Sequence, residues 1–214
     1  MHGLFRYLHG GAPHAHTEAA PQTTGNVIHW ANRYDLVVQI MGLGQARRLR
    51  RKTIECARIT PGDCVLDVGC GTGDLTLLAK KVTGPTGHAA GIDAAPEMIE
   101  VARGKAQRNR SDVDFRVGVI ERLPFPDGSF DVVLSSLMMH HLPADLIPMA
   151  LAEIRRVLRS PDTVSGKPNG QLVIVDFKGL LEQQRIVALV KAAGFERIET
   201  GKLWLNLVGF VRAV

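Results

Sequence analysis

The stretch Val65–Thr76, with the sequence VLDVGCGTGDLT, constrains this chain more than any other part of it. A short apolar run reaches Val68 and is followed by three alternating glycines, Gly69, Gly71 and Gly73, and then by an amphipathic helical pattern. A glycine-rich turn between a buried strand and a helix is typical of open α/β sheets, which bind ligands beyond the carboxyl ends of their strands. Glycine permits positive φ in such a turn and lets the backbone approach a ligand closely.

The spacing of these glycines argues against a dinucleotide pocket. The dinucleotide fingerprint is G-x-G-x-x-G, and its third glycine would fall at Asp74. A pyrophosphate also needs bare amides or cations at the helix start, whereas Asp67 and Asp74 flank this turn and Asp93 follows the next strand. Three carboxylates around one pocket favour a cationic ligand that carries a ribose. S-adenosylmethionine, with its sulfonium and ammonium groups, fits this description.

Four segments together resemble, in order, the successive motifs of class I S-adenosylmethionine-dependent methyltransferases. They are Val65–Thr76, Gly91–Met98, Leu123–Asp131 and Leu172–Phe177. The resemblance runs from about Tyr34 to about Phe177 and is closest to the methyltransferase type 11 group, which includes the ubiquinone/menaquinone C-methyltransferases. It implies an enzyme that uses S-adenosylmethionine. The implied fold is a Rossmann-like three-layer α/β sandwich, whose seven-stranded, mostly parallel sheet has a reversed last strand.

Alternating strand and helix patterns along the chain predict the same kind of fold. The expected strands are Cys64–Val68, His88–Ile92, Val113–Val117, Phe130–Ser135 and Gln171–Phe177. The expected helices are Asp74–Val82, Pro96–Asn109, Ala144–Leu158 and Leu181–Ala193. Two further strands, near Phe195–Thr200 and Leu205–Val214, follow without an intervening helix, which predicts an antiparallel final pair.

The chain divides into three expected parts. Residues 1–25 are rich in Gly, Ala, Pro and His, and are expected to form a flexible N-terminal arm. Residues 26–60 are expected to form a helical lid segment hinged around Gly42 and Gly44. Residues 61–214 are expected to form the S-adenosylmethionine-binding methyltransferase domain. With 214 residues and 45% hydrophobic content, the chain is long enough to bury one large core.

Composition argues against several other classes of protein. The sequence has no apolar run long enough for a transmembrane helix and no apolar signal core at its start, so it predicts a cytoplasmic protein. Cys56, Cys64 and Cys70 are odd in number and lack metal-binding spacing, which indicates reduced thiols and no metal site.

The chain carries a formal net charge of +5, and two segments are especially rich in cations. The first holds Arg47, Arg48, Arg50, Arg51 and Lys52, and the second holds Arg103, Lys105, Arg108 and Arg110. The apolar stripe of the first helix is expected to leave its cations on the outer, solvated face. No aromatic residues interleave with them, which argues against nucleic acid as a partner. Peripheral contact with anionic lipid stays open, and the apolar helix Leu181–Ala193 suits either a membrane or the sheet.

The glycine turn and the next strand provide most of the expected cosubstrate site. Asp93 ends the second strand, where its carboxylate can accept hydrogen bonds from both ribose hydroxyls; a helix N-cap is the alternative. Gly69, Gly71 and Gly73 are expected to lie against the cosubstrate. Thr72 is expected to bind its methionine portion, and Asp67 to orient the ammonium group or the loop itself. The alternative is that Asp67 is a buried carboxylate whose hydrogen bonds come from backbone amides, which would give the same sequence pattern.

Three positions bear on the remaining parts of the cosubstrate. The resemblance implies that Ser136 contacts the methionine end and that an acidic or amide side chain after the third strand binds adenine; here that position is Val119. Backbone groups of Val119 and Ile120 are expected to bind the adenine edge instead. Losing one neutral hydrogen bond costs on the order of 1 kcal/mol, so binding should weaken without vanishing. Met98 is expected to pack on the ribose and adenine, or in the core.

Two histidines follow the fourth strand within Met138–Leu142, which has the sequence MMHHL. This segment is expected to lie over the sulfonium. His140 and His141 are candidate catalytic bases, because imidazole titrates near neutral pH. A base matters only if the acceptor loses a proton, since methyl transfer itself gains chiefly from proximity and alignment. A paired histidine without a catalytic role is the alternative.

The sequence therefore predicts an S-adenosylmethionine-dependent methyltransferase that acts on a small, aromatic or lipophilic acceptor resembling a quinone precursor. An RNA or protein methyltransferase is the enzymatic alternative. Enzymes that methylate planar nitrogen often carry an Asn/Asp-Pro-Pro-Tyr/Phe loop where this chain has Ser135–Met138, with the sequence SSLM. A non-catalytic S-adenosylmethionine-binding partner protein is the alternative from a different class. Val119 and the short segment after Phe177 motivate it.

Overall fold

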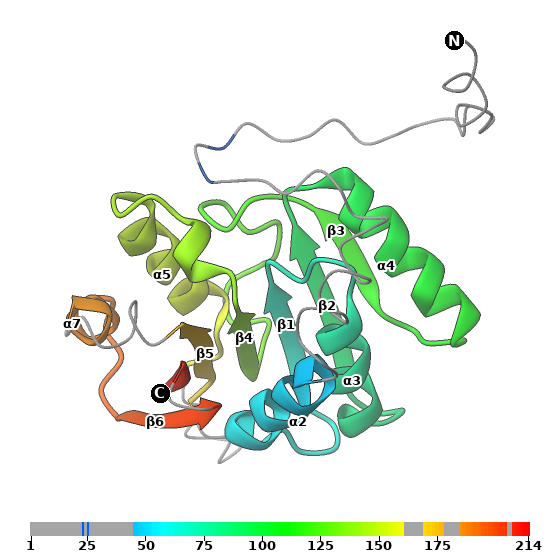
Figure 1. Cartoon of the computed structure of the whole chain (residues 1–214), viewed down its shortest axis with the longest axis horizontal. Coiled ribbons are helices and arrows are strands. Elements are labelled where there is room, and N and C mark those ends of the chain that lie inside the picture. The colour runs from blue at the N-terminus through cyan, green and yellow to red at the C-terminus, as the bar shows by residue number, and fades with distance from the viewer. Residues whose placement is uncertain (1–22, 24, 26–44, 161–168, 178–184, 205–206) are drawn as a thin grey trace, which may run out of the picture.

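The computed structural model describes Thr23, Gly25 and residues 45–160, 169–177, 185–204 and 207–214. These residues form one seven-stranded sheet with helices on both faces, which confirms the predicted three-layer α/β sandwich (Figure 1). The arm predicted over residues 1–25 lies outside the described residues except for Thr23 and Gly25. So does the part of the predicted lid that precedes residue 45.

The sheet has the order β3-β2-β1-β4-β5-β7-β6. Its strands are β1 (Cys64–Val68), β2 (His88–Asp93), β3 (Asp114–Val117), β4 (Val132–Ser136), β5 (Gln171–Phe177), β6 (Ile198–Trp204) and β7 (Val208–Ala213). Neighbouring strands from β3 to β5 run parallel, whereas β7 is antiparallel to both β5 and β6. The predicted reversed last strand is therefore confirmed.

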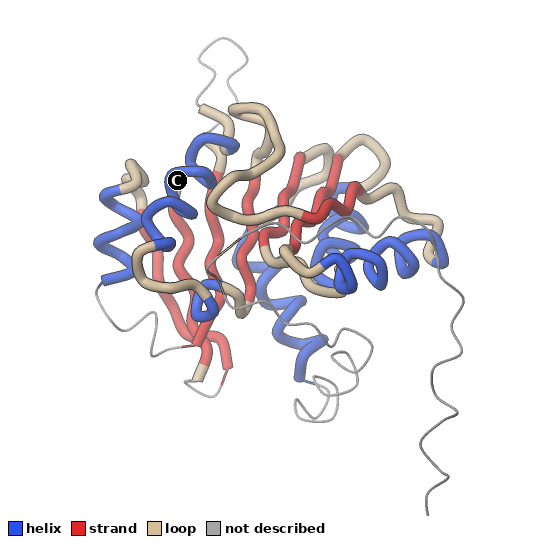
Figure 2. Tube along the Cα trace, turned by 90° about the horizontal axis from the view of Figure 1, so that it is seen from above, coloured by secondary structure: helices blue, strands red, loops and turns tan. Residues whose placement is uncertain are grey.

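The helices fall into two layers, which Figure 2 shows on opposite sides of the sheet. They are α2 (Gln45–Ala57), α3 (Asp74–Thr83), α4 (Pro96–Arg108), α5 (Leu146–Val157) and α7 (Arg185–Ala192), with a 3-10 turn, η1 (Met139–His141), after β4. α2, α3 and α4 pack on one face of the sheet, and α5 and α7 pack on the other. Since both faces are covered, central strands such as β1 are nearly continuous apolar runs.

The apolar character of α7 is explained by packing against the sheet. Ile186 and Val190 are 2% and 0% exposed and belong to the core that α5 forms with β4 and β5. None of the described helices is both long and apolar enough to cross a membrane.

Several elements begin or end at different residues from those predicted. β4 begins at Val132 rather than Phe130, because the amide of Phe130 donates instead to the carbonyl of Val157 at the end of α5. β6 begins at Ile198 rather than Phe195, whose buried ring packs in the core and whose amide donates back to Val190. Residues 181–184 of the predicted last helix lie outside the described residues.

Candidate functional site

A cavity of about 220 Å³ opens at the carboxyl ends of β1, β2 and β4. The strand order reverses between β1 and β4, and such a switch point is where open α/β sheets bind ligands. Nine of the ten cosubstrate-binding candidates line this cavity: Asp67, Gly69, Gly71, Thr72, Asp93, Met98, Val119, Ile120 and Ser136. Gly73 is not among the lining residues. Of the two candidate bases, His141 lines the cavity and His140 does not.

The three glycines of the turn all have positive φ, but they meet different surroundings. A Cβ added to Gly69 would lie 2.1 Å from Cγ of Met138, and one added to Gly73 would lie 2.6 Å from Cζ of Phe115. A Cβ added to Gly71 would meet nothing within 4 Å. Gly69 and Gly73 thus permit close packing within the protein, whereas Gly71 leaves open space beside the cavity.

This difference predicts that Gly71→Ala and Gly73→Ala affect different properties. The alanine at position 71 should lower stability by only about 1–2 kcal/mol, the cost of left-handed backbone, while its methyl group weakens S-adenosylmethionine binding at least about tenfold. The alanine at position 73 should lower stability by more, because Phe115 must move. Thermal unfolding and calorimetric titration separate the two effects. Wild-type affinity in Gly71→Ala would contradict a close approach of ligand at this residue.

Asp93 lies at the end of β2, with both carboxylate oxygens engaged by backbone amides. Oδ2 accepts a hydrogen bond from the amide of Gly71 at 2.8 Å, and Oδ1 accepts one from the amide of Ala95 at 2.9 Å. Burial raises the pKa of Asp93, and the amide donors oppose that shift. The N-cap of α4 is Ala95, without a side-chain cap, so the N-cap alternative for Asp93 is wrong. Each oxygen keeps a second lone pair that can accept from a ribose hydroxyl.

Asp67 lies beneath the same cavity and is almost fully buried. Its Oδ2 accepts a hydrogen bond of 2.7 Å from the hydroxyl of Thr76 on α3. Burial raises the pKa of Asp67 to about 7, and the nearby charge of Asp93 acts in the same direction. A carboxyl group with this pKa gains or loses its proton near neutral pH, according to whether a cation approaches it.

Asp74, the third carboxylate of the turn, is balanced by two cations. Arg50 of α2 lies 3.0 Å from its Oδ2, and Lys105 of α4 lies 2.8 Å from its Oδ1. Lys105 also donates to the hydroxyl of Thr72 at 2.9 Å. Asp67 and Asp93 are instead held by hydroxyl and amide groups.

The position of Arg50 corrects the prediction that all cations of residues 47–52 lie on the outer face. Arg50 lines the cavity, and 23% of its side chain is exposed. It lies three residues before Thr53 and four before Ile54, both of which are buried, so it shares their face of α2. That spacing is the sequence signal that could have identified Arg50 as a site residue.

The segment after β3 forms the wall of the cavity at which adenine is expected. Val119 and Ile120 line it, and the carbonyl of Val119 accepts a hydrogen bond from the amide of Arg122. Met98 is 2% exposed and also lines the cavity, so it belongs both to the core and to this wall. Glu121, which is not among the site residues that the sequence predicts, lines the cavity as well.

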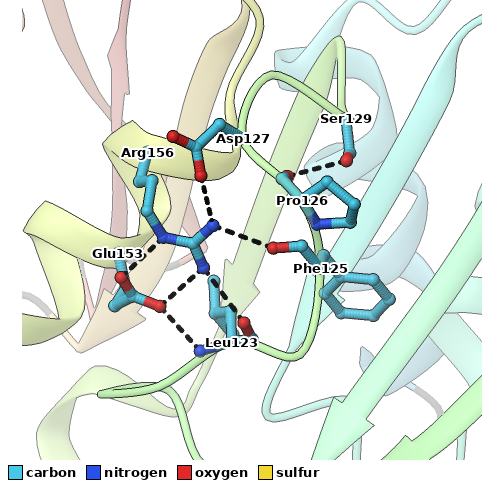
Figure 3. A network of polar contacts seen from close by, with 7 residues as sticks. All are labelled: Leu123, Phe125, Pro126, Asp127, Ser129, Glu153 and Arg156. Atoms are coloured by element: carbon cyan, nitrogen blue, oxygen red, sulfur yellow. Dashed lines mark hydrogen bonds and ion pairs between the residues drawn. The ribbon is translucent and has the colours of Figure 1, made fainter.

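A polar network attaches residues 123–127, which follow this wall of the cavity, to α5 (Figure 3). The guanidinium of Arg156 donates to the carbonyls of Leu123 and Phe125 and forms ion pairs with Glu153 and Asp127. Glu153 in turn accepts from the amide of Leu123 at 2.8 Å, and its pKa is lowered mainly by its hydrogen bonds to Arg156. The motif Leu123–Asp131 is thus held in place immediately after the cavity wall, without lining the cavity itself.

The chain leaves β4 through a strained residue. Leu137 has a φ of 54°, which is uncommon for a residue with a side chain and costs on the order of 1–3 kcal/mol. Its amide donates to the carbonyl of Val175 on β5, which stabilises this conformation. The turn places Ser136 and His141 on the cavity wall, so the strain lies where two predicted site residues are positioned.

His140 is held by a buried carboxylate. Its Nδ1 lies 2.7 Å from Oδ1 of Asp176, which is 0% exposed at the end of β5. The rings of His140 and His141 lie 4.0 Å apart, and the pKa of His141 is lowered by burial and then by the charge of His140. Asp176 is not among the site residues that the sequence predicts. A lone carboxylate within the otherwise apolar strand QLVIVDF was the available signal.

The residues around the cavity fit S-adenosylmethionine. Asp93 offers acceptors for two hydroxyls, and Asp67 can become an anion beside a cationic group. Gly71 leaves room for close approach of the backbone, and Met98 and Val119 offer an apolar surface for a base.

Comparison with known proteins identifies the domain. Residues 65–161 match the methyltransferase domain family. A demethylmenaquinone methyltransferase of Symbiobacterium thermophilum is 36% identical over 148 residues, which are 68% of this chain and 55% of that protein. The ubiquinone/menaquinone biosynthesis C-methyltransferase UbiE of Burkholderia multivorans is 33% identical over 166 residues, or 78% of this chain and 64% of that protein. This chain therefore spans less than two thirds of the length of either relative.

Solved structures agree on the fold. An S-adenosylmethionine-dependent methyltransferase from Aquifex aeolicus superposes with a TM-score of 0.65 at 22% identity, covering 77% of this chain and 88% of that one. The [4+2]-cyclase SpnF superposes with a TM-score of 0.63 at 20% identity, covering 78% and 79%. A shared fold does not by itself decide the reaction. The sequence match over residues 65–161 identifies a methyltransferase domain, and the sheet order is that of the class I Rossmann-like methyltransferase fold.

Proposed function

We propose that this chain transfers a methyl group from S-adenosylmethionine to a small aromatic or lipophilic acceptor that resembles a quinone precursor. The observation that carries the proposal is the carboxylate of Asp93, fixed 2.8 Å from the amide of Gly71 at the wall of the cavity. Two relatives at 36% and 33% identity, one named for demethylmenaquinone and one for ubiquinone and menaquinone, support the choice of acceptor class.

In this proposal a different group of cavity residues binds each part of the cosubstrate. Asp93 accepts from the ribose hydroxyls, and Gly69 and Gly71 provide the backbone that approaches the ligand. Asp67 and Thr72, together with Ser136, bind the methionine portion. Met98, Val119 and Ile120 enclose the adenine. Gly73 acts indirectly, because it lets the turn pack against Phe115.

The expected domain organisation follows from the same proposal. We propose that residues 1–25 form a flexible arm, residues 26–60 a lid and residues 61–214 the cosubstrate-binding domain. The described part of the lid, α2, supports this division, because its residues Ala46, Leu49 and Arg50 line the cavity.

S-adenosylmethionine supplies an activated methyl group on a positively charged sulfur. The chain's own residues hold the acceptor in line with that group and exclude water, since alignment is the main source of rate in such a displacement. Where the acceptor must lose a proton, His140 or His141 is proposed to remove it.

The pKa of Asp67 leads to a pH-dependent prediction. Only the ionised carboxylate attracts an ammonium group, and this carboxyl is largely protonated below its raised pKa of about 7. S-adenosylmethionine affinity should therefore rise by up to about tenfold per pH unit as the pH increases toward 7, and level off above it. Calorimetric titration at a series of pH values measures this rise.

Asp67→Asn is the matched variant for this prediction. Its affinity should stay near the low-pH value of the wild type throughout, because an amide cannot ionise. Circular dichroism at each pH establishes that both proteins remain folded. A wild-type affinity that does not change between about pH 5 and pH 8 would contradict the role of Asp67.

The proposed function is tested by transfer of radioactive methyl groups to defined acceptors. We expect the purified chain to label prenylated hydroquinones or alkylphenols, recovered by extraction into organic solvent. Label in precipitated RNA or protein, with none in the extract, would favour the alternative enzyme classes. Cosubstrate binding without transfer to any acceptor would favour the non-catalytic partner protein.

A further inference from the structure

The carboxyl end of β5 carries a group of residues that the cosubstrate cavity does not use. Asp176 is fully buried there and accepts three hydrogen bonds, from the amides of His140 and Phe177 and from the His140 ring. The ring contact is 2.7 Å long and joins Nδ1 to Oδ1. A buried carboxylate with this many donors holds one orientation, and the imidazole that it binds is held with it.

The hydrogen bond to Asp176 also determines which nitrogen of His140 carries a proton. An ionised carboxylate only accepts hydrogen bonds, so Nδ1 must be the donor. In the neutral ring, Nε2 is then left without a proton and is free to accept one. The same carboxylate stabilises the imidazolium that forms after Nε2 takes up a proton.

An exposed aromatic ring lies beside His140. Phe177 is 46% exposed and meets the His140 ring edge to face, with centroids 4.9 Å apart. It pairs with Val208 of β7, which follows Leu207, a residue that is 56% exposed. Phe177 and Leu207 thus lie at the end of the sheet where the cavity opens, which is formed by the carboxyl ends of the parallel strands. Solvent also reaches the His140 side chain, which is 27% exposed.

His141 connects this group to the cavity. Its ring lies 4.0 Å from that of His140 and lines the cavity itself. A molecule resting on Phe177 and His140 therefore lies next to the cavity. Among the described residues, Asp176 and His141 are the titratable groups in contact with His140.

We propose that His140 and Phe177 form the acceptor subsite, and that it takes a planar aromatic compound with an ionisable hydroxyl group. In this subsite Phe177 stacks on the acceptor ring, and Nε2 of His140 takes the hydroxyl proton. Asp176 is a positioning residue, because it acts through His140. This inference rests on the proposed function and adds the acceptor's chemistry and the identity of its base.

The reaction balances in protons and electrons without any further reactant. The hydroxyl proton moves to Nε2, and the electron pair left on the acceptor forms the new bond to the methyl carbon. The bond between that carbon and sulfur breaks, and its electron pair stays on sulfur, which becomes neutral. If the methyl group goes to a ring carbon, that carbon loses its hydrogen as the hydroxyl is restored, so one proton in total passes to His140 and then to solvent.

The first test is the proton position on His140, which long-range ¹H–¹⁵N correlation spectra of the wild-type protein report directly. We expect Nδ1 to carry the proton at slightly alkaline pH, with the resonances assigned by their absence in His140→Gln. Asp176→Asn should lose this preference, because an amide can donate to the ring nitrogen. A proton on Nε2 in the wild type would overturn the inference, whatever the fate of the variants.

The second test uses 4-nitrophenol, whose visible absorption distinguishes phenol from phenolate. In the presence of S-adenosylhomocysteine, we expect wild-type protein to shift the bound probe toward the phenolate. His140→Gln and Asp176→Asn should lose this shift, and Phe177→Ala should weaken probe binding at least about fivefold, the loss of one aromatic contact. His88→Gln is the matched control, since His88 is exposed at the opposite edge of the sheet and should behave like wild type.

Calorimetric titration with S-adenosylmethionine separates failure of the inference from failure of the proposed function. If the wild type does not bind S-adenosylmethionine, both proposals fail. If it binds and the probe shift survives in His140→Gln, only the acceptor subsite is wrong. Variants that bind the cosubstrate with wild-type affinity yet lose the probe shift and at least about a hundredfold in transfer rate support the inference.

Discussion

Asp93→Ala is expected to lower S-adenosylmethionine affinity by about a hundredfold or more. Hydrogen bonds to a charged acceptor contribute about 1.5–3 kcal/mol each, and the proposed contact with the ribose makes two of them. Their combined loss, about 3 kcal/mol at least, corresponds to two powers of ten in the dissociation constant. Calorimetric titration of the purified variant measures the effect, and S-adenosylhomocysteine should lose affinity to the same extent because it carries the same ribose.

The same substitution should change stability much less than it changes binding. It leaves the amides of Gly71 and Ala95 without their acceptor, which is unfavourable, but it also removes a carboxylate whose pKa is raised by burial. These two effects oppose each other. Glu100→Ala, which removes an exposed carboxylate from α4, is the matched control and should bind normally. Wild-type affinity in Asp93→Ala would contradict the role of Asp93 on which the proposed function rests.

Arg156→Met is expected to have the largest effect on stability. The substitution leaves the carbonyls of Leu123 and Phe125 without their donor and Glu153 without its cation. Each partly buried group left without a partner costs about 1–3 kcal/mol, and because 31% of the Arg156 side chain is exposed we expect a total near the low end, about 3 kcal/mol. For a chain of this length that loss lowers the melting temperature by about 6–12 °C.

Arg156→Met should also weaken cosubstrate binding, because the network holds the chain just beyond Val119 and Ile120. Arg155→Met is the matched control: Arg155 is the neighbouring residue on α5, and its guanidinium lies 5.8 Å from the ring of Phe195. Thermal unfolding and calorimetric titration of both variants give the comparison. Equal melting temperatures for the two variants would show that the network in Figure 3, which attaches residues 123–127 to α5, does not stabilise the protein.

The sequence was sufficient to predict the fold. The alternation of strand and helix predicted a parallel sheet with an antiparallel final pair, and the resemblance to class I methyltransferases implied seven strands with a reversed last one; the structure confirms both. Element ends were less certain, as at Phe130 and Phe195, because contacts made by distant segments decide where a strand begins. Hydrophobic periodicity reflects burial along one element and carries no information about its neighbours.

The sequence also identified the residues around the cavity that lie within recognisable motifs. Nine of the ten predicted cosubstrate residues line it, because each lies at or shortly after the carboxyl end of β1, β2, β3 or β4, and these ends meet at one edge of the sheet. The roles proposed for these residues await the binding experiments above. The motif does not distinguish Gly71 from Gly73. Both have positive φ, but a Cβ added to Gly73 would collide with Phe115, whereas one added to Gly71 would meet open space.

Tertiary structure alone decided which side chains pair across the site. Arg50 belongs to a helix whose cations were predicted to face solvent, yet it reaches Asp74 on α3. Asp176 and His140 are 36 residues apart and come within 2.7 Å because β4 and β5 are neighbours in the sheet. The sequence by itself determined the fold and the location of the cavity, because the periodicity of its strands and helices, its glycine turn and the order of its motifs are all local features of the chain. The charge balance around the cavity and the orientation of His140 depend on distances between separate elements, which only the packed sheet and helices set.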